Sequence, residues 1–264
     1  MKVILAPFSA GGLGKTKGCE LAPSAILSAS KEIFLNEFLK SPKIRELALD
    51  LDNSNIELSF EKIENCIKEL PEKPLILGGD HSITYASFKG FSKKFSNPGI
   101  LVFDAHPDLE NDFFPPSHED YLRRLISEGH VKSENVVLVG VRNLHQNELK
   151  VINDLNLKPF YMKNAYNLGV EDLANLIMQN VRKVDGLYVS IDIDVIDPAF
   201  APGTGHIEPG GFTSREFLYL IQRILNLKNI RAFDIVEVNP TKDINGMTVK
   251  LGAKILLELL NNEY

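Results

Sequence analysis

Several features that restrict function are scarce or absent in this 264-residue chain. It has no tryptophan and two cysteines, Cys19 and Cys66, with no second Cys or His at zinc-ligand spacing beside either. A thiolate metal site and a disulfide framework are therefore not expected, and both cysteines are predicted to be buried as small apolar residues. No uncharged run reaches about 18 residues, and the apolar start over residues 3–8 is too short for a signal-peptide core. The sequence predicts a cytoplasmic protein without a membrane span.

Positive charge is not in excess either. Lys and Arg number 29 against 35 Asp and Glu, which gives a formal net charge of −6. Such a chain has no general basic field for a polyanion, so nucleic acid is not an expected partner. Hydrophobic residues make up 44% and charged residues 24%, as in ordinary globular proteins. Because no linker, repeat or low-complexity tract divides the chain, we expect a single domain over residues 1–264.

Short β-branched runs alternate along the chain with longer segments of helical period. Strands are predicted over residues 2–6, 44–51, 75–77, 100–103, 136–141, 159–162, 187–193 and 230–236. Helices are predicted over residues 21–39, 59–70, 118–128, 170–181, 214–225 and 248–260. Thr213 is expected to cap one of them, with Glu216 completing a capping box. The alternation predicts an α/β fold: three α/β/α layers around a mostly parallel, doubly wound sheet.

Polar side chains collect where three of the predicted strands end. The run Gly78-Gly79-Asp80-His81-Ser82 follows one strand. The run Asp104-Ala105-His106-Pro107-Asp108 follows the next, and its three polar residues share one face in extended chain. Near residue 192, two aspartates alternate with apolar residues in the third strand. Because carboxylates on one face of a buried strand repel each other, a cation between them is the simpler interpretation.

Six residues at these strand ends form the predicted metal site: His81, Asp104, His106, Asp108, Asp192 and Asp194. One metal ion rarely needs six protein ligands, whereas two divalent cations with bridging carboxylates use them all. An oxygen-rich set without thiolates suits Mn²⁺ better than structural zinc. A water shared by two such ions has a much lowered pKa and becomes a nucleophile.

The three polar segments, in this order, resemble the signatures of the ureohydrolase family, the arginases and agmatinases. The similarity continues over residues 201–205, 208–211 and 234–240 and spans nearly the whole chain. It implies an arginase-like fold, with the six residues above as ligands of two manganese ions. Family members usually assemble as trimers or hexamers, so the resemblance also implies a homo-oligomer.

The resemblance further implies roles for residues around the metal ions. His118 matches a proton-shuttling histidine, and Glu237 matches a glutamate that binds the guanidinium group. Asp120 and His206 are predicted to contact the substrate, although both lie where the chain departs from the family pattern. Relatives commonly have Gly after the shuttling histidine, where Glu119 and Asp120 follow here, and they usually have Thr where His206 stands. Asp108, His118 and Glu237 are accordingly the predicted catalytic residues.

The implied reaction is attack of an activated water on the guanidinium carbon, after which the tetrahedral intermediate collapses to urea and an amine. Asp108 would pass a proton to the leaving nitrogen. Arginases commonly hold the substrate's α-amino group with an aspartate after a Gly-x-Arg turn, and residues 140–145 contain none, although Glu148 follows. Agmatine, cleaved to putrescine in polyamine metabolism, is therefore the favoured small guanidino substrate. Arginine, another guanidino acid and formiminoglutamate remain open.

Two other classes of function compete with this interpretation. Gly14, Lys15 and Thr16 follow the first strand as in a phosphate loop, but the required glycine five positions earlier is Ser9. A non-catalytic protein that binds metal or a guanidino ligand is a second alternative, which the departures at residues 119, 120 and 206 keep open.

Overall fold

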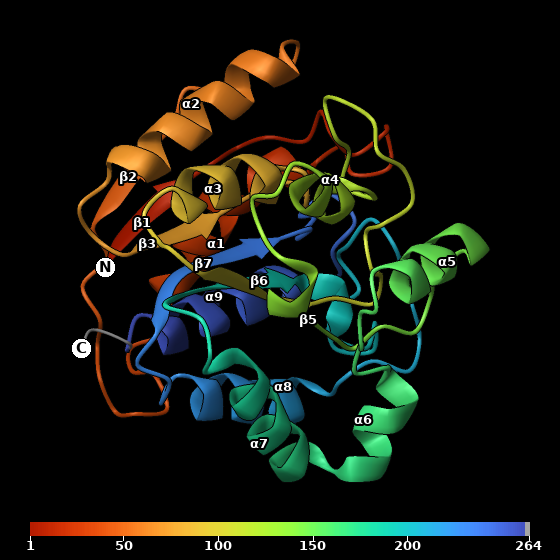
Figure 1. Ribbon diagram of the computed structural model, residues 1–264. Helices are drawn as coiled ribbons and strands as arrows, with labels where there is room; N and C mark the ends of the chain where they lie inside the picture. The colour runs from red at the N-terminus through yellow and green to blue at the C-terminus, as the bar shows by residue number, and fades with distance from the viewer. Residues whose placement is uncertain (262–264) are drawn as a thin grey trace.

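The computed structural model describes residues 1–261 as one seven-stranded sheet between two layers of helices (Figure 1). Every pair of neighbouring strands is parallel, in the order β2-β1-β3-β7-β6-β4-β5. The strands are β1 (Lys2–Leu5), β2 (Glu46–Ala48), β3 (Pro74–Leu77), β4 (Pro98–Phe103), β5 (Val136–Val139), β6 (Gly186–Asp192) and β7 (Ile230–Val236). The predicted fold class is confirmed, and the sheet is wholly rather than mostly parallel.

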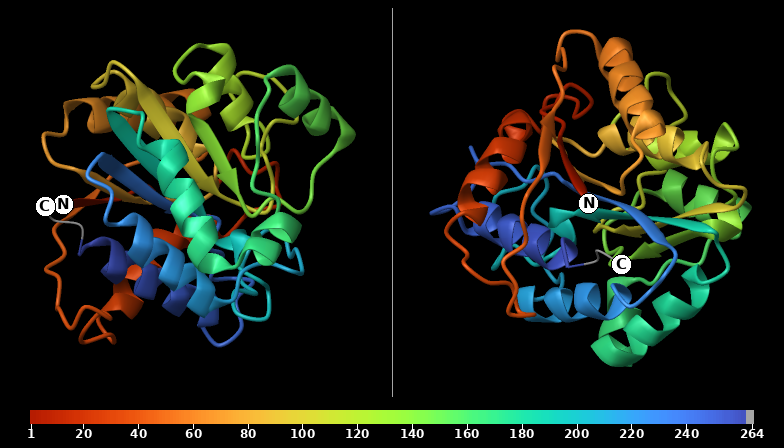
Figure 2. Two further views of the ribbon diagram at one scale, coloured as in Figure 1. Left: turned by 60° about the horizontal axis from the view of Figure 1, so that its bottom comes forward. Right: turned by 90° about the vertical axis from the view of Figure 1, so that its left-hand side faces the viewer.

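The helices cover both faces of the sheet, as the two views of Figure 2 show. One layer is formed by α2 (Ile56–Glu69), α3 (Ile83–Ser92) and α4 (Tyr121–Ser127), with α3 packed against both others. The other layer contains α1 (Ala22–Ser30), α7 (Val170–Val181), α8 (Ser214–Ile224) and α9 (Met247–Leu259), which pack in the order α1, α9, α8, α7. The shorter α5 (Gln146–Asp154) and α6 (Met162–Leu168) follow β5. Within residues 1–261, no helix has the length and apolar character to cross a bilayer.

The two helical layers enclose two hydrophobic clusters, one on each side of the sheet. Strand β4 shows the division: Leu101 and Phe103 pack into the cluster beneath α1, α7, α8 and α9. Ile100 and Val102 pack into the cluster beneath α2, α3 and α4. Because successive side chains of a strand point to opposite faces, a strand buried on both faces reads as a continuous apolar run. This explains why β4 and β5 show no polar alternation.

Several predicted elements differ from those in the structure. The predicted strand 159–162 is absent: Phe160 makes only an isolated bridge with Val139, and α6 begins at Met162. The predicted strand 44–51 shrinks to the exposed edge strand β2. The predicted helix 21–39 ends at Ser30, because Asn36 bonds to the carbonyl of Leu257 and to backbone amides of its own loop instead.

Three further differences concern burial and helix limits. The predicted helix 118–128 begins only at Tyr121, so His118 lies in the loop before it. Helix α3 was not predicted, because eight of its ten residues are buried and it lacks a polar face. Cys19 is buried as expected, whereas Cys66 is only partly buried; both are free thiols.

Candidate metal centre

The predicted site residues meet at the carboxyl edge of four adjacent strands, β3, β7, β6 and β4. His81 follows β3, Asp104 follows β4, Asp192 ends β6, and Glu237 follows β7. The sheet order therefore brings together side chains from widely separated parts of the chain. Open α/β sheets bind their ligands at this edge.

An inner cluster forms around the imidazole of His81. Its Nδ1 lies 3.1 Å from an Oδ2 atom of each of three aspartates, Asp104, Asp108 and Asp192. All four side chains are buried. His81 Nδ1 and Asp104 Oδ2 make no hydrogen bond to any residue within 1–261. Buried polar atoms without partners are costly, so this convergence points to a cation between them.

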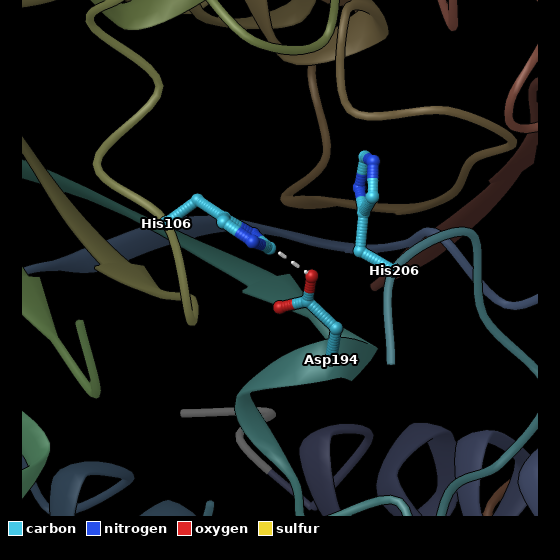
Figure 3. A group of neighbouring side chains, drawn as sticks. All are labelled: His106, Asp194 and His206. Carbon is cyan, nitrogen blue, oxygen red and sulfur yellow. Dashed lines mark ion pairs between the residues drawn. The ribbon is translucent and has the colours of Figure 1, made fainter. Parts of the chain in front are cut away.

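An outer cluster lies beside the inner one and shares Asp104 with it. His106 Nδ1 is 3.1 Å from Asp194 Oδ2 and 3.5 Å from Asp104 Oδ1. Figure 3 shows the His106 ring directed at Asp194, with His206 standing beside them on a neighbouring loop. Ligand atoms of His106, Asp194 and His206 lie near enough to one another to hold an ion. Asp104 thus has an oxygen near each cluster.

Backbone amides fix three of these carboxylates. Asp104 Oδ1 accepts from the N–H of His106, Asp192 Oδ1 accepts from the N–H of Asp194, and Asp194 Oδ1 accepts from the N–H of Ala105. In each aspartate Oδ2 is directed into a cluster, and in Asp104 the bonded Oδ1 also lies beside His106 of the outer cluster. The backbone therefore orients these carboxylates whether or not an ion is bound.

A buried network fixes the ring of His81. Asp234 accepts hydrogen bonds at 2.7 Å from the hydroxyls of Thr84, Tyr188 and Ser190. Because the single proton of Ser190 goes to Asp234, the Ser190 oxygen accepts from His81 Nε2 at 2.9 Å. In the neutral ring of His81 the lone pair then lies on Nδ1, which faces the three aspartates, and this is the tautomer that a metal ligand needs.

The acidity of the aspartates reflects their crowding. Burial and the charge of Asp104 raise the pKa of Asp108 well above its usual range. Burial together with the charges of Asp194 and Asp104 does the same for the pKa of Asp192. Carboxylates that share a site without a cation disfavour one another's charged forms. The donor set fits two divalent ions, because two positive charges per cluster would relieve this repulsion.

Glu237 and His118 line the same cavity beside the inner cluster. Glu237 Oε1 accepts from the N–H of His81 at 2.8 Å and lies 3.3 Å from His118 Nδ1. Burial alone would raise the pKa of Glu237, but the His118 and His81 contacts lower it. Burial would lower the pKa of His118, yet Glu237 raises it to about 9. The two residues therefore form a buried, charged pair at neutral pH.

Backbone strain marks two of the predicted catalytic residues. Asp108 has a φ of 52° and Glu237 a φ of 64°, a left-handed conformation that residues with a Cβ seldom adopt. The N–H of Glu237 donates to Gly79 O at 2.7 Å. Gly79 itself allows this close packing, since a Cβ there would lie 1.7 Å from the carbonyl oxygen of Phe8. The surrounding loops thus hold the strained residues in place.

A cavity of about 180 Å³ opens onto both clusters and onto Glu237. His118 and His206 line it as stacked rings, 5.4 Å between centroids and 13° between planes. Asp120 does not line it: the carboxylate is buried and accepts from the N–H of Ser117 instead. The position of Asp120 therefore does not support the predicted substrate contact. The other predicted site residues lie together.

The sequence did not reveal the supporting residues of the site. Asp234 was the one detectable among them, since it is a carboxylate inside an otherwise apolar strand, β7. Thr84, Tyr188 and Ser190 carry no pattern that sets them apart. The rest of the cavity wall includes residues for which no role was predicted: Lys15, Glu110, Glu119, Asn143, His145 and Glu148.

Two adjoining clusters of carboxylates and imidazoles lie at the carboxyl edge of a doubly wound parallel sheet. This arrangement is typical of one class of protein, and it makes the chain a candidate two-metal hydrolase.

Comparison with known proteins narrows this class to a family. The sequence profile of the Arginase family matches residues 1–261. The arginase of Staphylococcus aureus (strain MRSA252) is 31% identical over 281 residues, which cover 90% of either chain. The chain belongs to the arginase family and is a hydrolase acting on linear amidines, the compounds that include guanidines.

Solved structures agree with this assignment. Formimidoylglutamase from Bacillus subtilis subsp. subtilis str. 168 superposes with a TM-score of 0.92 at 27% identity, covering 99% of this chain and 86% of that one. Proclavaminate amidino hydrolase from Streptomyces clavuligerus superposes with a TM-score of 0.90 at 30% identity, covering 98% and 90%. The similarity thus extends over nearly the whole described chain.

Proposed function

We propose that this protein hydrolyses a small guanidino compound to urea and an amine with two manganese ions, and that agmatine, cleaved to putrescine, is the substrate. The observation that carries the proposal is the single cavity onto which both ligand clusters and the buried carboxylate of Glu237 open. An electrophilic guanidinium group held at Glu237 would lie beside both ligand clusters.

The six predicted ligands would hold the ions: His81, Asp104, His106, Asp108, Asp192 and Asp194. Four carboxylates, two imidazoles and no thiolate favour Mn²⁺ over softer metals. When bound, two such ions supply a water whose pKa is lowered far enough for it to ionise near neutral pH. Asp104 supports a paired site because its two oxygens face different clusters.

Glu237 would bind the guanidinium group, which stays protonated at any working pH. Its Oε1 is already oriented by the N–H of His81, and the lowered pKa keeps the carboxylate charged. A charged carboxylate accepts the parallel N–H groups of a guanidinium well. The group would therefore be held in a fixed orientation at the inner end of the cavity.

Asp108 and His118 would handle protons on opposite sides of the substrate. Asp108 lies at the cavity wall as well as in the inner cluster, so it would take a proton from the attacking water and pass it to the leaving nitrogen. His118 Nε2 is buried, lines the cavity and has no hydrogen-bond partner within residues 1–261. It would shuttle protons between the site and the solvent.

The charge of the cavity favours agmatine over a guanidino acid. Apart from the ligands, its wall carries four carboxylate side chains and one lysine: Glu110, Glu119, Glu148, Glu237 and Lys15. This excess of negative charge favours a substrate whose far end is an ammonium group, as in agmatine, over one that ends in a carboxylate.

Arginine is the second candidate, because the similar protein from Staphylococcus aureus is named an arginase. The similarity to formimidoylglutamase keeps formiminoglutamate as a third compound to test. Assembly as a trimer or hexamer is part of the same proposal, and size-exclusion chromatography with light scattering checks it.

The test is product release by manganese-loaded protein from agmatine, arginine, guanidinobutyrate and formiminoglutamate, with urea or formamide measured as appropriate. Urea from agmatine at the highest kcat/KM is the expected result. A clear preference for another compound contradicts the substrate, and no product from any compound while metal is bound favours the non-catalytic alternative.

Asp194→Ala provides the control for this test. Since Asp194 contributes to the outer cluster, metal content and urea release should fall together in this variant. Full activity with one metal ion lost would contradict the two-metal assignment.

A further inference from the structure

An ion pair crosses the mouth of the cavity. Lys15 Nζ lies 2.6 Å from Glu119 Oε1, and the two side chains are 51% and 27% exposed. Lys15 belongs to the loop after β1 and Glu119 to the loop before α4, and both line the cavity. The pair therefore joins two loops at the entrance of the cavity in which the proposed substrate would bind.

Lys15 is the only lysine or arginine that lines this cavity within residues 1–261. The neighbouring arginines are directed elsewhere. Arg142 Nη2 donates to the carbonyls of Asp194 and Glu208, and Arg123 Nη1 donates to the carbonyls of Leu109 and Glu110. Lys242 is near as well, but its Nζ donates to the carbonyls of Lys15 and Gly205 and does not line the cavity. Among the described residues, a negatively charged end of a substrate would therefore find no other guanidinium or ammonium group in the wall.

Glu119 occupies this one ammonium group. Burial alone would raise the pKa of Glu119, but the hydrogen bond from Lys15 and the charges of Lys15 and His118 lower it. Glu119 is thus ionised at neutral pH, and the pair has no net charge.

The pair also lies close to where the guanidinium group would bind. Glu119 Oε1 is 3.8 Å from His118 Nε2, and His118 Nδ1 is 3.3 Å from Glu237 Oε1. A Cβ built on Gly205 would lie 3.3 Å from Glu237 Oε2 and 3.7 Å from Lys15 O. Glu237 Oε2 and the carbonyl oxygen of Lys15 therefore face the same point beside Gly205, and a short alkyl chain extending from Glu237 toward the mouth would pass the pair.

We propose that the Lys15–Glu119 pair is a specificity-determining element that makes the cavity discriminate against guanidino compounds whose far end is a carboxylate. The inference rests on the proposed function. With Glu119 in place, an incoming carboxylate meets a neutralised lysine and further acidic side chains, Glu110 and Glu148. Without the charge of Glu119, Lys15 becomes a free cation at the mouth and attracts that carboxylate.

The test compares agmatine with guanidinobutyrate, which have the same guanidinium head and opposite charge at the far end. In Glu119→Gln we expect the ratio of kcat/KM for guanidinobutyrate to that for agmatine to rise about tenfold over the wild type. Most of the change should lie in KM, because the pair contacts the far end of the substrate. A ratio within twofold of the wild type would overturn the proposal.

Two further variants distinguish the effect of releasing Lys15 from the effect of lowering the negative charge of the cavity wall. Glu110→Gln removes a negative charge from the same wall without releasing Lys15, so its ratio should change less than in Glu119→Gln. In the double variant Lys15→Met/Glu119→Gln the gain should disappear. Persistence of the gain in the double variant, or an equal gain in Glu110→Gln, would show that Lys15 is not responsible.

The same measurements distinguish a failure of the specificity role from a failure of the proposed function. Urea from agmatine with an unchanged ratio refutes the specificity role and leaves the hydrolase function standing. If neither compound is cleaved, calorimetric titration of the manganese-loaded wild type and Glu119→Gln measures the dissociation constants of the same two compounds. The proposal then requires the ratio of the two dissociation constants to shift by about tenfold in favour of guanidinobutyrate. Circular dichroism melts of all variants confirm that each is folded.

Discussion

At the scale of single residues, the proposed metal centre depends on a carboxylate that is not one of its six ligands. Asp234 accepts three hydroxyl hydrogen bonds and, through Ser190, sets the tautomer of His81. An amide at this position offers one oxygen to three donors, so Ser190 would no longer be held as an acceptor for His81 Nε2. We expect Asp234→Asn to weaken Mn²⁺ binding by about tenfold to a hundredfold, measured by competition with a chelating dye.

Asp154→Asn is the matched control, because Asp154 is exposed at the end of α5 and far from the cavity wall. Its Mn²⁺ affinity should equal that of the wild type. Unaltered affinity in a folded Asp234→Asn protein would mean that the His81 ring is held by other contacts.

The pair of His118 and Glu237 makes stability depend on pH. The pKa of His118 rises from 6.5 to about 9 on folding, so its contribution is complete below pH 6.5 and is lost as the pH rises through 9. The pKa of Glu237 is lowered, so its contribution is complete above its unfolded pKa of 4.5 and is lost at lower pH. The pair therefore stabilises most between about pH 4.5 and 6.5, by on the order of 3 kcal/mol.

Urea unfolding of metal-free wild type and His118→Asn measures this dependence. We expect the difference in free energy of unfolding to shrink between pH 6.5 and 9. A difference that stays constant over this range would show that His118 is neutral in the folded protein.

At the scale of elements, α8 illustrates how local sequence fixes a helix boundary. Thr213 accepts from the N–H of Glu216, and Glu216 accepts from the N–H and hydroxyl of Thr213, as the capping box predicted. Phe217, Leu220 and Ile221 of the same helix are fully buried. The cap therefore stabilises the start of a helix that carries part of the core.

Thr213→Ala removes this cap and should lower the free energy of unfolding by about 1 kcal/mol. Equilibrium urea unfolding measures it as a lower midpoint with an unchanged slope. Ser214→Ala, one residue further on, is the comparison and should cost much less, because Ser214 does not cap the helix. Equal losses in the two variants would argue against the capping box.

Helices with a clear amphipathic period were predicted well, and so was the buried strand β7, whose bounds are those predicted. The bounds predicted for α7 are those of the structure, and α8 differs by one residue. Prediction from hydrophobic period failed where tertiary contacts decide the structure. Helix α3 is buried on nearly all sides and so shows no amphipathic period. The segment after α1 is not helical because Asn36 holds it against α9. Phe160, in the missing strand, bonds only at the very end of β5.

At the scale of the whole molecule, the spacing of polar residues after the strands predicted that the six proposed ligands come together, but not how they divide into two clusters. The two clusters arise because β3, β7, β6 and β4 are neighbours, which the order of strands along the chain does not reveal. The placement of Asp120 away from the cavity has a local origin instead, since its carboxylate accepts from the N–H of Ser117, three residues earlier. Long-range packing decides how the ligands divide, and a local turn decides where Asp120 lies.

Metal binding should stabilise the whole fold, because the ligands are brought together only in the native state. With free Mn²⁺ at about a hundred times the dissociation constant, the gain is about 2.7 kcal/mol. We expect a higher Tm for manganese-loaded protein than for chelator-treated protein, by differential scanning calorimetry, and a smaller rise for Asp194→Ala. An unchanged Tm on adding Mn²⁺ would contradict a preformed metal centre.

The most direct measurement is a titration of metal-free protein with Mn²⁺, in which urea release from agmatine is followed against the number of ions bound per chain. If both clusters hold an ion and act together, urea release rises with the ions bound and levels off at about two per chain. Full activity at one ion per chain, or urea release that does not depend on metal, would contradict a two-metal hydrolase.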